Sequence, residues 1–289
     1  MSGNELTVNG VRLVFDVHGA GANTVVLAGP IGAPGSAWVP FQVPALVEAG
    51  YRVITFNPRG VPPSQVPPPP YSVADMAADV AGLVVELAAG PVAMIGYSMG
   101  ALVTQELALE HPELLRGAAL LGTLGRKDAM RRALFEASLA TLRSGQRLPR
   151  TMEVVTRALQ LFAPARLDDD RWAQAYLDMA LAGADPDPET RRGLLGQQEA
   201  TTAYDNRLDA LSTITVPLLV IGFGLDLLVP AALTREVAEA IPGARYLEIS
   251  DCGHGGPWEV PDRINPVLAE FLAELPLAST NEPDAHERR

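Results

Sequence analysis

Residues 91–110 read Pro-Val-Ala-Met-Ile-Gly-Tyr-Ser-Met-Gly-Ala-Leu-Val-Thr-Gln-Glu-Leu-Ala-Leu-Glu, and they hold the pattern that decides the fold. The apolar run Pro91–Ile95 predicts a buried strand, and the periodicity of Met99–Glu110 predicts a helix. Between them lies a G-x-S-x-G pattern, Gly96–Gly100, on a sharp strand-to-helix turn. Such a turn exposes the hydroxyl of Ser98 and directs the next backbone N–H outward at the helix N-terminus, where negative charge is favoured. The sequence therefore predicts a nucleophilic serine.

A serine hydroxyl is a weak nucleophile until a base accepts its proton, and histidine is the usual base. Of the four histidines, His18, His111 and His286 stand at positions typical of surface or capping residues. His254 lies in the glycine-rich stretch Asp251-Cys-Gly-His-Gly-Gly-Pro257, directly after a predicted strand. Such a loop can present an imidazole at the end of a neighbouring strand. We therefore predict His254 as the base.

The base needs a carboxylate that fixes its tautomer and stabilises its protonated form. The chain order serine, acid, histidine places this carboxylate between the other two, at a strand end. Asp226 follows the apolar strand Val216–Ile221 by a few residues. Asp251 competes, but three residues from the histidine it is better placed to hold its own loop, and Asp209 precedes its strand. Asp226 is therefore the predicted acid.

Strand and helix signals alternate on both sides of the serine turn. An Asn9-Gly10 dipeptide predicts a tight hairpin near the N-terminus. The predicted strands are Leu6–Val8, Val11–Phe15, Thr24–Ala28, Tyr51–Phe56, Pro91–Ile95, Gly117–Leu121, Val216–Ile221 and Arg245–Ile249. The predicted helices of this part are Ser72–Leu87, Met99–Glu110, Ala231–Ile241 and Pro261–Glu274. Continuous apolar strands alternating with helices predict an α/β fold, with a mostly parallel central sheet and helices on both faces.

Strand signals stop between about Gly125 and Ser212. Four helices are predicted there, at Lys127–Arg143, Thr151–Phe162, Asp168–Ala182 and Pro188–Thr202. The third begins with three aspartates, whose side chains suit a helix N-terminus. We therefore predict an all-helical lid inserted into an α/β core. The expected division is residues 1–124 and 213–276 for the core, 125–212 for the lid and 277–289 for a flexible tail.

Composition excludes several classes of protein. The 289 residues carry a net charge of −12, and because Arg126–Asp209 is balanced at 13 basic and 13 acidic residues, the surplus lies on the α/β part. An acidic surface repels phosphate backbones, so we expect no nucleic-acid partner. No apolar run approaches the roughly 20 residues of a membrane span, and the N-terminus lacks a secretory pattern. A single cysteine, Cys252, favours a reducing, cytoplasmic location.

With these motifs the chain resembles the α/β-hydrolase fold superfamily over nearly its full length, helical lid included. The resemblance rests on the Gly29 loop, Asn57-Pro-Arg-Gly60 with Ser64, Gly96–Gly100, Gly222–Pro230 and Gly253-His254. The chain is most similar to the bacterial branch of cofactor-free haloperoxidase-like esterases and lid-bearing hydrolases of small molecules. The resemblance implies a Ser98–His254–Asp226 triad, an acyl-enzyme and an oxyanion hole to which Met99 contributes. It implies that any peroxidase-like activity is a side reaction through a peracid, without metal or haem.

One departure from the family concerns the oxyanion hole. Relatives commonly have His-Gly after the strand matching Thr24–Ala28, and the next residue donates the second N–H. Here the stretch is Leu27-Ala-Gly-Pro-Ile-Gly32, and the matching residue is Pro30, which has no N–H. Either a shift of one residue lets Ile31 donate, or Met99 donates alone, and losing one donor typically costs about 10²–10³ in rate. The motif Asn57–Ser64 also departs, since relatives usually have Asp and glycine-x-glycine there, which affects loop shape.

Several aromatic residues are candidates for a substrate pocket. Trp172, Tyr176 and Met179 share one face of their helix, which fits either packing of the lid on the core or an apolar acyl pocket. Trp38 and Trp258 follow the loops that carry the predicted oxyanion donor and the histidine. The predicted pocket residues are Pro30, Trp38, Trp172, Tyr176 and Trp258.

The predicted function is a serine hydrolase of small apolar carboxylic esters, lactones or thioesters. A second hypothesis keeps the triad but ends in cyclisation, elimination or acyl transfer in a natural-product pathway, because Pro30 puts the oxyanion hole in doubt. A third is a small-molecule receptor on the same scaffold. A small molecule is the expected partner, with neither nucleic acid nor membrane, for a monomer or homodimer. Scattered histidines and one cysteine offer no metal-ligand spacing, so we expect no metal or other cofactor.

Overall fold

The computed structural model describes residues 3–276, so the predicted tail at 277–289, with His286, lies outside the described residues. One eight-stranded sheet runs through the molecule in the order β1-β2-β4-β3-β5-β6-β7-β8. The strands are β1 (Asn4–Val8), β2 (Val11–His18), β3 (Thr24–Ala28), β4 (Arg52–Asn57), β5 (Val92–Tyr97), β6 (Leu115–Leu121), β7 (Leu218–Phe223) and β8 (Arg245–Ile249). The β1–β2 and β2–β4 pairs are antiparallel, and the remaining pairs are parallel.

The turn between the first two strands follows from its sequence. Asn9 and Gly10 both have positive φ, 49° and 72°, as a two-residue hairpin turn requires. The following strands β3, β5 and β6 are buried along their whole length, which fits parallel strands covered on both faces. The carboxyl ends of the parallel strands therefore meet at one edge of the sheet, where the loops that follow them gather.

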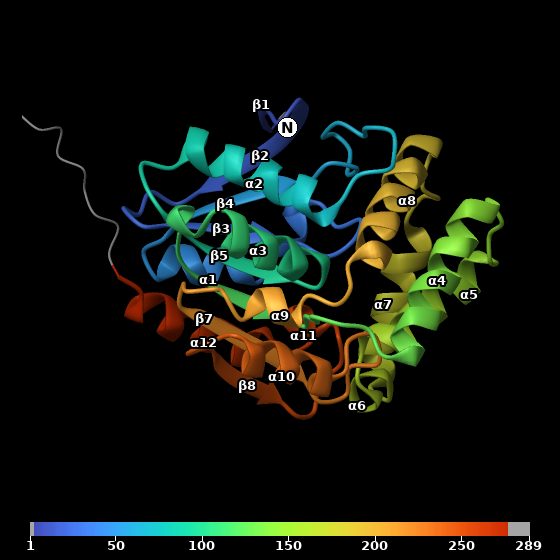
Figure 1. The fold of residues 1–289 in the computed structure, drawn as a ribbon. Coiled ribbons are helices and arrows are strands. Elements are labelled where there is room, and N and C mark those ends of the chain that lie inside the picture. Colours follow the sequence, from blue (N-terminus) through green and yellow to red (C-terminus); the bar gives the residue numbers. More distant parts are fainter. Residues whose placement is uncertain (1–2, 277–289) are drawn as a thin grey trace, which may run out of the picture.

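Helices cover both faces of this sheet (Figure 1). On one face lie α2 (Val73–Leu87), α3 (Met99–Glu110) and α10 (Ala231–Ala240), and on the other α1 (Gln42–Glu48) and α12 (Pro261–Glu274). The predicted α/β architecture is confirmed. Helix α1 was not predicted, because it is only seven residues long and its N-cap residue, Phe41, provides no side-chain cap. The structure also adds a short 3₁₀ turn at Gly35–Trp38, another at Pro112–Leu114, and the four-residue helix α11 (Gly256–Glu259).

Between β6 and β7 the described elements are all helical. They are α4 (Ala129–Ser144), α5 (Arg150–Leu161), α6 (Pro164–Leu167), α7 (Asp170–Ala182), α8 (Pro188–Ala203) and α9 (Leu208–Leu211). The four long helices match the predicted ones within two residues at each end, and the one-turn helices α6 and α9 were not predicted. Asp169, in the predicted aspartate triplet, caps α7 by accepting from the N–H of Trp172 at 3.1 Å. We call helices α4 to α8 the helical insert; Figure 1 places it together at one side of the sheet.

The chain enters and leaves the insert through two segments that are bonded to each other. The N–H of Arg207 donates to the carbonyl oxygen of Gly125 at 2.6 Å. The N–H of Lys127 donates to the carboxylate of Asp205 at 2.7 Å. Lys127 is the single lysine of the chain, and its buried Nζ donates to the carbonyl oxygen of Tyr204, at the C-terminal end of α8. Burial lowers the pKa of this ammonium group. The base of the insert is therefore closed by hydrogen bonds.

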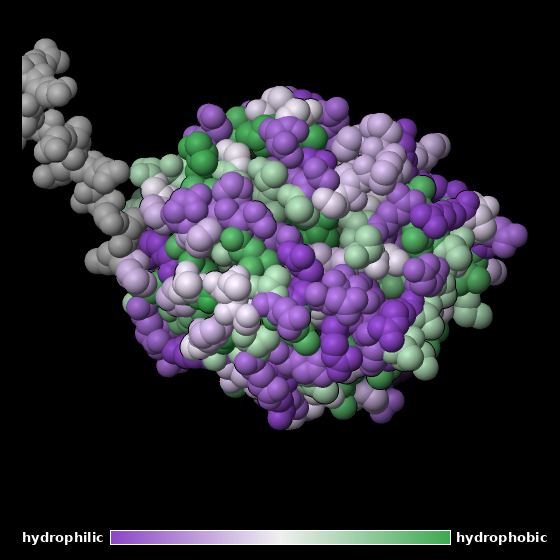
Figure 2. Space-filling model, viewed as in Figure 1, coloured by the Kyte–Doolittle hydropathy of each residue, from purple (hydrophilic) through white to green (hydrophobic). Residues whose placement is uncertain are grey.

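The described surface mixes polar and apolar side chains. Figure 2 shows hydrophilic and hydrophobic residues interspersed over this face. More than half of the large apolar side chains that are exposed belong to the insert or its connecting loops: Met130, Leu148, Met152, Val155, Leu159, Met179 and Leu181. Within residues 3–276, no helix combines the length and apolar character needed to cross a bilayer.

Candidate active site

Ser98 lies at the turn between β5 and α3 in a strained backbone conformation. Its φ of 56° and ψ of −118° lie outside the regions that side chains favour. The flanking glycines make the turn possible. A Cβ on Gly96 would lie 2.5 Å from the carbonyl oxygen of Gly100, and one on Gly100 would lie 2.0 Å from the carbonyl oxygen of Ala28. Both glycines of the motif are thus required by close backbone approach, and the turn leaves the serine partly exposed.

The structure brings Ser98, His254 and Asp226 together. The Nε2 atom of His254 lies 2.9 Å from Oγ of Ser98, and its Nδ1 lies 2.6 Å from Oδ2 of Asp226. The histidine and the aspartate are both buried, at 3% and 4% exposure. Because a carboxylate only accepts, Nδ1 carries the proton and Nε2 is free to accept from the serine hydroxyl. The arrangement is that of a serine with a general base and an acid that orients it.

Asp226 is held by the backbone that follows β7. Its Oδ1 accepts from the N–H groups of Leu228 and Val229, at 2.8 and 2.7 Å, which leaves Oδ2 for the histidine. The competing Asp251 instead pairs with Arg263 at 2.6 Å on the surface. Asp209 lies in α9, before β7. Of the three carboxylates considered in the sequence, Asp226 is therefore the one that bonds to His254.

Tyr97 contacts His254 through both its hydroxyl and its ring. Its hydroxyl donates to the carbonyl oxygen of His254 at 2.6 Å, and its ring lies 5.2 Å from the imidazole, centroid to centroid. The sequence analysis did not single out Tyr97, although its position directly before the serine was an available signal. Burial raises the pKa of this phenol well above its usual value, so it remains a donor at neutral pH.

Trp38 and Trp258 contact the ring of Tyr97. Both rings meet it edge to face, with centroids 6.4 and 5.4 Å away. The indole N–H of Trp258 also donates to the carbonyl oxygen of Ala37 at 3.3 Å. We call Asp251–Pro257 the histidine loop. The two tryptophans pack on Tyr97, which in turn bonds to His254 of this loop. Their role as pocket residues remains a prediction.

The loop after β3, Gly29–Gly35, contains the candidate oxyanion donor. The N–H of Ala33 donates to the carbonyl oxygen of Pro30 at 3.1 Å, which closes a four-residue turn. Gly32, the third residue of this turn, has a φ of 71°, as a type II turn requires. Its N–H donates to Oε1 of Gln197 at 2.8 Å. Pro30 has no N–H, so only the N–H of Ile31 in this turn has no acceptor among the described residues.

The side chain of Asn57, the last residue of β4, bonds to the same loop. Asn57 accepts from the N–H of Gly35 through Oδ1 at 2.9 Å and donates to the carbonyl oxygen of Pro62 at 2.9 Å. Arg59 forms a buried bidentate pair with Asp79, with both N–O distances 2.6 Å. Asn57 therefore connects the motif that departs from the family to the Gly29–Gly35 loop, and the effect of the departure on loop shape stays a prediction.

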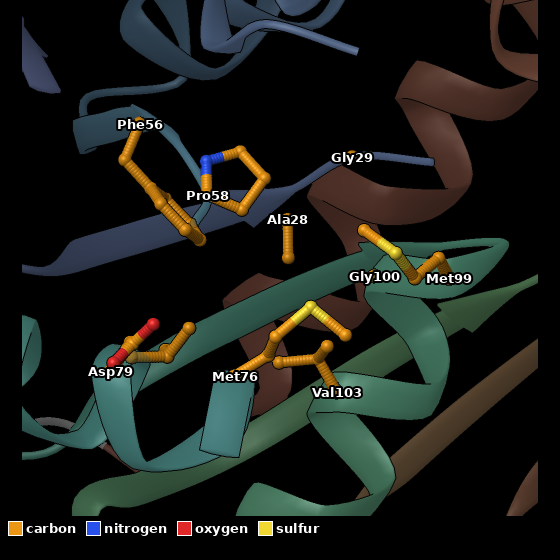
Figure 3. A pocket seen from close by; sticks show the side chains of 10 residues that line it. Ala28, Gly29, Phe56, Pro58, Met76, Asp79, Met99, Gly100 and Val103 are labelled. Atoms are coloured by element: carbon orange, nitrogen blue, oxygen red, sulfur yellow. The ribbon is translucent and has the colours of Figure 1, made fainter. Parts of the chain in front are cut away.

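A small cavity lies behind the serine turn (Figure 3). Its volume is about 10 Å³, room for about one water molecule. It is lined by the ends of β3 and β4 and by helices α2 and α3, through Ala28, Gly29, Phe56, Pro58, Met76, Asp79, Val80, Met99, Gly100 and Val103. At this size the cavity holds no acyl group.

The insert reaches the histidine loop through Glu259. The buried carboxylate of Glu259 accepts from the N–H of Gly253 at 3.0 Å and from that of Ala163, between α5 and α6, at 3.2 Å. The N–H of Gly255 donates to the carbonyl oxygen of Leu161 at 2.6 Å. Burial raises the pKa of Glu259, against the lowering effect of the two N–H donors. The sequence analysis did not single out this residue, because a glutamate before a helix is common on a surface.

Trp172 and Tyr176 form an aromatic cluster with Phe162. Their rings stack on each other at 5.5 Å, and each meets Phe162 edge to face, at 4.6 and 5.3 Å. Phe162 in turn touches the histidine loop, because a Cβ on Gly255 would lie 2.8 Å from its ring. Of the two interpretations left open by the sequence, these contacts correspond to packing. Met179 is 68% exposed, so the apolar face predicted for this helix does not extend to it.

A thiol and possible metal ligands are the other groups to consider for the chemistry of the site. Cys252 is buried, and burial raises its pKa to about 12, so the thiol is neutral at physiological pH. Over the described range, no group of three or more His, Cys, Asp or Glu side chains could hold a metal ion. The titratable side chain that bonds to Ser98 is His254, which bonds in turn to Asp226.

Comparison with known proteins gives consistent matches. A family model described as alpha/beta hydrolase fold matches residues 17–261. The chain is 38% identical over 265 residues to a Mycobacterium tuberculosis protein provisionally named non-heme bromoperoxidase BpoC, covering 92% of this chain and 99% of the relative. It is 30% identical over 269 residues to a protein from Azorhizobium caulinodans provisionally named carbamate hydrolase RutD, covering 91% of this chain and 96% of the relative.

Solved structures agree. The structure of Rv0554 from Mycobacterium tuberculosis has a TM-score of 0.85 and 36% identity, covering 92% of this chain and 94% of that one. The enol-lactonase from Burkholderia xenovorans LB400 has a TM-score of 0.80 and 28% identity, covering 94% of this chain and all of the other. The likeness thus spans both the sheet and the insert.

Proposed function

The chain belongs to the α/β-hydrolase fold family and is similar to its haloperoxidase-like branch, and on that premise we propose that it is a serine hydrolase of small apolar esters, lactones or thioesters. A single observation carries the proposal: the hydrogen-bonded series from Ser98 through His254 to Asp226, at 2.9 and 2.6 Å. An enol-lactonase and a carbamate hydrolase among the similar proteins support hydrolysis of an acyl group as the reaction class.

The proposed mechanism has two steps. Oγ of Ser98 attacks the carbonyl carbon of the substrate while Nε2 of His254 takes the hydroxyl proton, and the alcohol or thiol leaves with that proton. A water molecule, deprotonated by the same nitrogen, then attacks the acyl-enzyme, and the acid leaves as Ser98 regains its proton. Asp226 holds the imidazole in the required tautomer and stabilises its charged form.

We assign Met99 and Ile31 as donors to the oxyanion that forms in both steps. The N–H of Met99 lies at the first position of α3, where helix N–H groups have no intrahelical partner. The N–H of Ile31 is the one left without an acceptor in the Pro30–Ala33 turn, within the described residues. Pro30 thus removes one donor position while its neighbour supplies another.

We propose that residues 125–212, which comprise the helical insert and the segments that connect it to the core, form the lid over the serine. Its contacts with the histidine loop through Glu259 and Phe162, and with the Gly29–Gly35 loop through Gln197, support this placement. The balanced charge of residues 126–209, with 13 basic and 13 acidic side chains, favours uncharged, apolar substrates. Trp172 and Tyr176 of the lid, together with Pro30 of the Gly29–Gly35 loop, are the proposed contacts with the acyl group.

A fluorophosphonate probe tests this proposal. It should label the wild-type protein at Ser98, as located by mass spectrometry, and Ser98→Ala should abolish both labelling and hydrolysis of p-nitrophenyl esters. Ser212→Ala, at an exposed serine, is the control and should behave as wild type. A panel of lactones, thioesters and carbamates then separates the substrate classes. If folded wild-type protein is not labelled by excess probe, the proposal fails, whereas labelling without hydrolysis of any panel member favours acyl transfer or cyclisation.

A further inference from the structure

The side chain of Gln197 connects the helical insert to two loops of the core. Its Oε1 accepts from the N–H of Gly32 at 2.8 Å, and its Nε2 donates to the carbonyl oxygen of Arg59 at 2.8 Å. The residue is fully buried, with 0% exposure. A buried amide with an acceptor and a donor bond of this length is held in one orientation. Gln197 therefore makes a fixed contact with the loop that follows β3.

Helix α8 presents this side chain from a close backbone contact with the core. A Cβ on Gly193 would lie 1.8 Å from the carbonyl oxygen of Gly60, so the two backbones touch. The hydroxyl of Tyr71 donates to the carbonyl oxygen of Gly193 at 3.3 Å. One turn from the glutamine on the same face, Leu194 packs against Gly32, where a Cβ would lie 2.5 Å from its methyl group. Helix α8, which carries Gln197, thus packs closely on these loops of the core.

The second partner of Gln197 is fixed as well. Arg59, whose carbonyl oxygen accepts from Nε2, is held at its guanidinium by the buried carboxylate of Asp79, at 2.6 Å through two nitrogens. The amide of Gln197 therefore spans an anchored carbonyl and the Gly32 N–H. Its oxygen sets the direction in which the Ile31–Gly32 peptide faces.

That peptide determines the shape of the Pro30–Ala33 turn. With Gly32 at a φ of 71°, the turn has the type II geometry, in which the central peptide faces opposite to its direction in a type I turn. Gln197 accepts from the N–H of this central peptide, so a reversal of the peptide would break this hydrogen bond. The Gly32 N–H is thus occupied, whereas the preceding Ile31 N–H has no acceptor among residues 3–276.

We propose that Gln197 is a positioning residue of the active site: from the insert, it holds the Pro30–Ala33 turn in the conformation that presents the Ile31 N–H to the oxyanion. This inference rests on the proposed function. It assigns the insert a part in transition-state stabilisation that is separate from covering the substrate. Gln197 does not touch the reacting atoms, so its effect passes through the turn.

Three variants test the proposal. Gln197→Met removes both hydrogen bonds at similar volume. Gln197→Glu keeps an oxygen for the Gly32 N–H, and because full burial favours the neutral carboxyl, its O–H replaces Nε2 as donor to the carbonyl oxygen of Arg59. Gln198→Met is the matched control, because Gln198 is also buried on α8 but bonds within the insert, to Thr202 at 3.2 Å and Phe135 at 3.5 Å. For each we would measure kcat and KM with a p-nitrophenyl ester, fluorophosphonate labelling, and hydrogen exchange of the peptide that contains residues 29–35.

We expect Gln197→Met to lower kcat by about 10- to 100-fold, because misplacing a reacting partner by 1 Å costs about 10²-fold. KM should change less than threefold, since the oxyanion forms after substrate binds. Exchange of residues 29–35 should rise in Gln197→Met, and Gln198→Met should match wild type in all three measurements. Gln197→Glu should retain wild-type exchange and at least a third of kcat.

The opposite results overturn the proposal. It fails if Gln197→Met and Gln198→Met are alike in kcat and exchange, or if Gln197→Glu loses as much kcat as Gln197→Met. If Gln197→Met does not fold, Gln197→Glu decides, and raised exchange in that variant refutes the inference. If wild-type protein neither labels nor hydrolyses any ester, the proposed function fails by itself. The exchange comparison of the two methionine variants then still decides whether Gln197 holds the turn.

Discussion

The hydroxyl of Tyr97 donates to the carbonyl oxygen of His254 at 2.6 Å. Tyr97 directly precedes Ser98, and it thus holds the histidine whose Nε2 lies next to the Ser98 hydroxyl. The two loops that must meet at the active site are therefore joined by a hydrogen bond that does not involve the reacting atoms. The bond is buried beneath the histidine loop, and Trp38 and Trp258 cover the Tyr97 ring.

Tyr97→Phe should destabilise the protein and slow the reaction. The carbonyl oxygen of His254 loses a buried donor, which typically costs about 1–3 kcal/mol. Because the imidazole is then less well held, we expect kcat to fall by up to about tenfold with KM little changed. Urea denaturation and ester kinetics measure the two effects. Tyr246→Phe, which removes a hydroxyl on β8 away from the site, should cost stability but leave kcat unchanged; equal kcat losses would refute the link.

Asp226→Asn should lower kcat by about 10⁴-fold, as the loss of the orienting carboxylate does in serine proteases. The asparagine oxygen would remain on the N–H groups of Leu228 and Val229, so its NH₂ would face Nδ1 of His254. The imidazole would then carry its proton on Nε2 and could not accept one from Ser98. Asp251→Asn is the control, because that carboxylate pairs with Arg263 at the surface. A loss of similar size in Asp251→Asn would contradict the assignment.

Much of the fold could be predicted because the local signals agree with the tertiary structure. Helix α12 has the predicted bounds Pro261–Glu274, since a proline suits the first turn of a helix. The strand-turn-helix pattern around Ser98 also located the turn that carries the serine. Helix α1 escaped prediction, because seven residues without a side-chain cap leave too little periodicity.

The supporting residues of the site could not be predicted in the same way. Gln197 is an ordinary helix former in sequence, and its two bonds reach residues 165 and 138 positions away. Likewise, Glu259 contacts Ala163, 96 positions away. These contacts exist only because the insert folds back on the core loops. A local sequence pattern can indicate candidate reactive residues, but it does not indicate the residues from distant parts of the chain that contact them.

Lys127→Met should lower the free energy of unfolding by about 1–3 kcal/mol, because it leaves buried carbonyl oxygens at the end of α8 without their donor. Chemical denaturation measures the change. Arg147→Met is the comparison variant, since it removes a surface ion pair with Asp185, and such pairs contribute at most about 1 kcal/mol. Equal destabilisation by the two variants would show that Lys127 does not hold the base of the insert.

Glu259→Gln should change how stability depends on pH. Burial raises the pKa of Glu259 above its ordinary value of 4.5 in the folded protein, so the unfolded chain releases this proton at lower pH than the folded one. The stabilisation from protonated Glu259 is therefore complete below about pH 4.5 and is lost as the pH rises through the raised folded pKa. Other carboxylates with lowered pKa values, such as Asp75 and Glu248, act in the opposite direction. The quantity to measure is thus the difference in unfolding free energy between wild type and Glu259→Gln, from urea denaturation at several pH values.

This difference should shift against the wild type as the pH rises from about 4.5, because the glutamine stays neutral throughout. Asp251→Asn serves as the control, since that carboxylate has a lowered pKa beside Arg263; removing it should give a difference that moves the other way, in favour of the wild type as pH rises. A flat difference for Glu259→Gln would mean that its carboxylate titrates alike in both states. A difference that favours the wild type with rising pH would mean that the N–H donors of Gly253 and Ala163 outweigh burial. The contact between the insert and the histidine loop would then be strongest with Glu259 ionised.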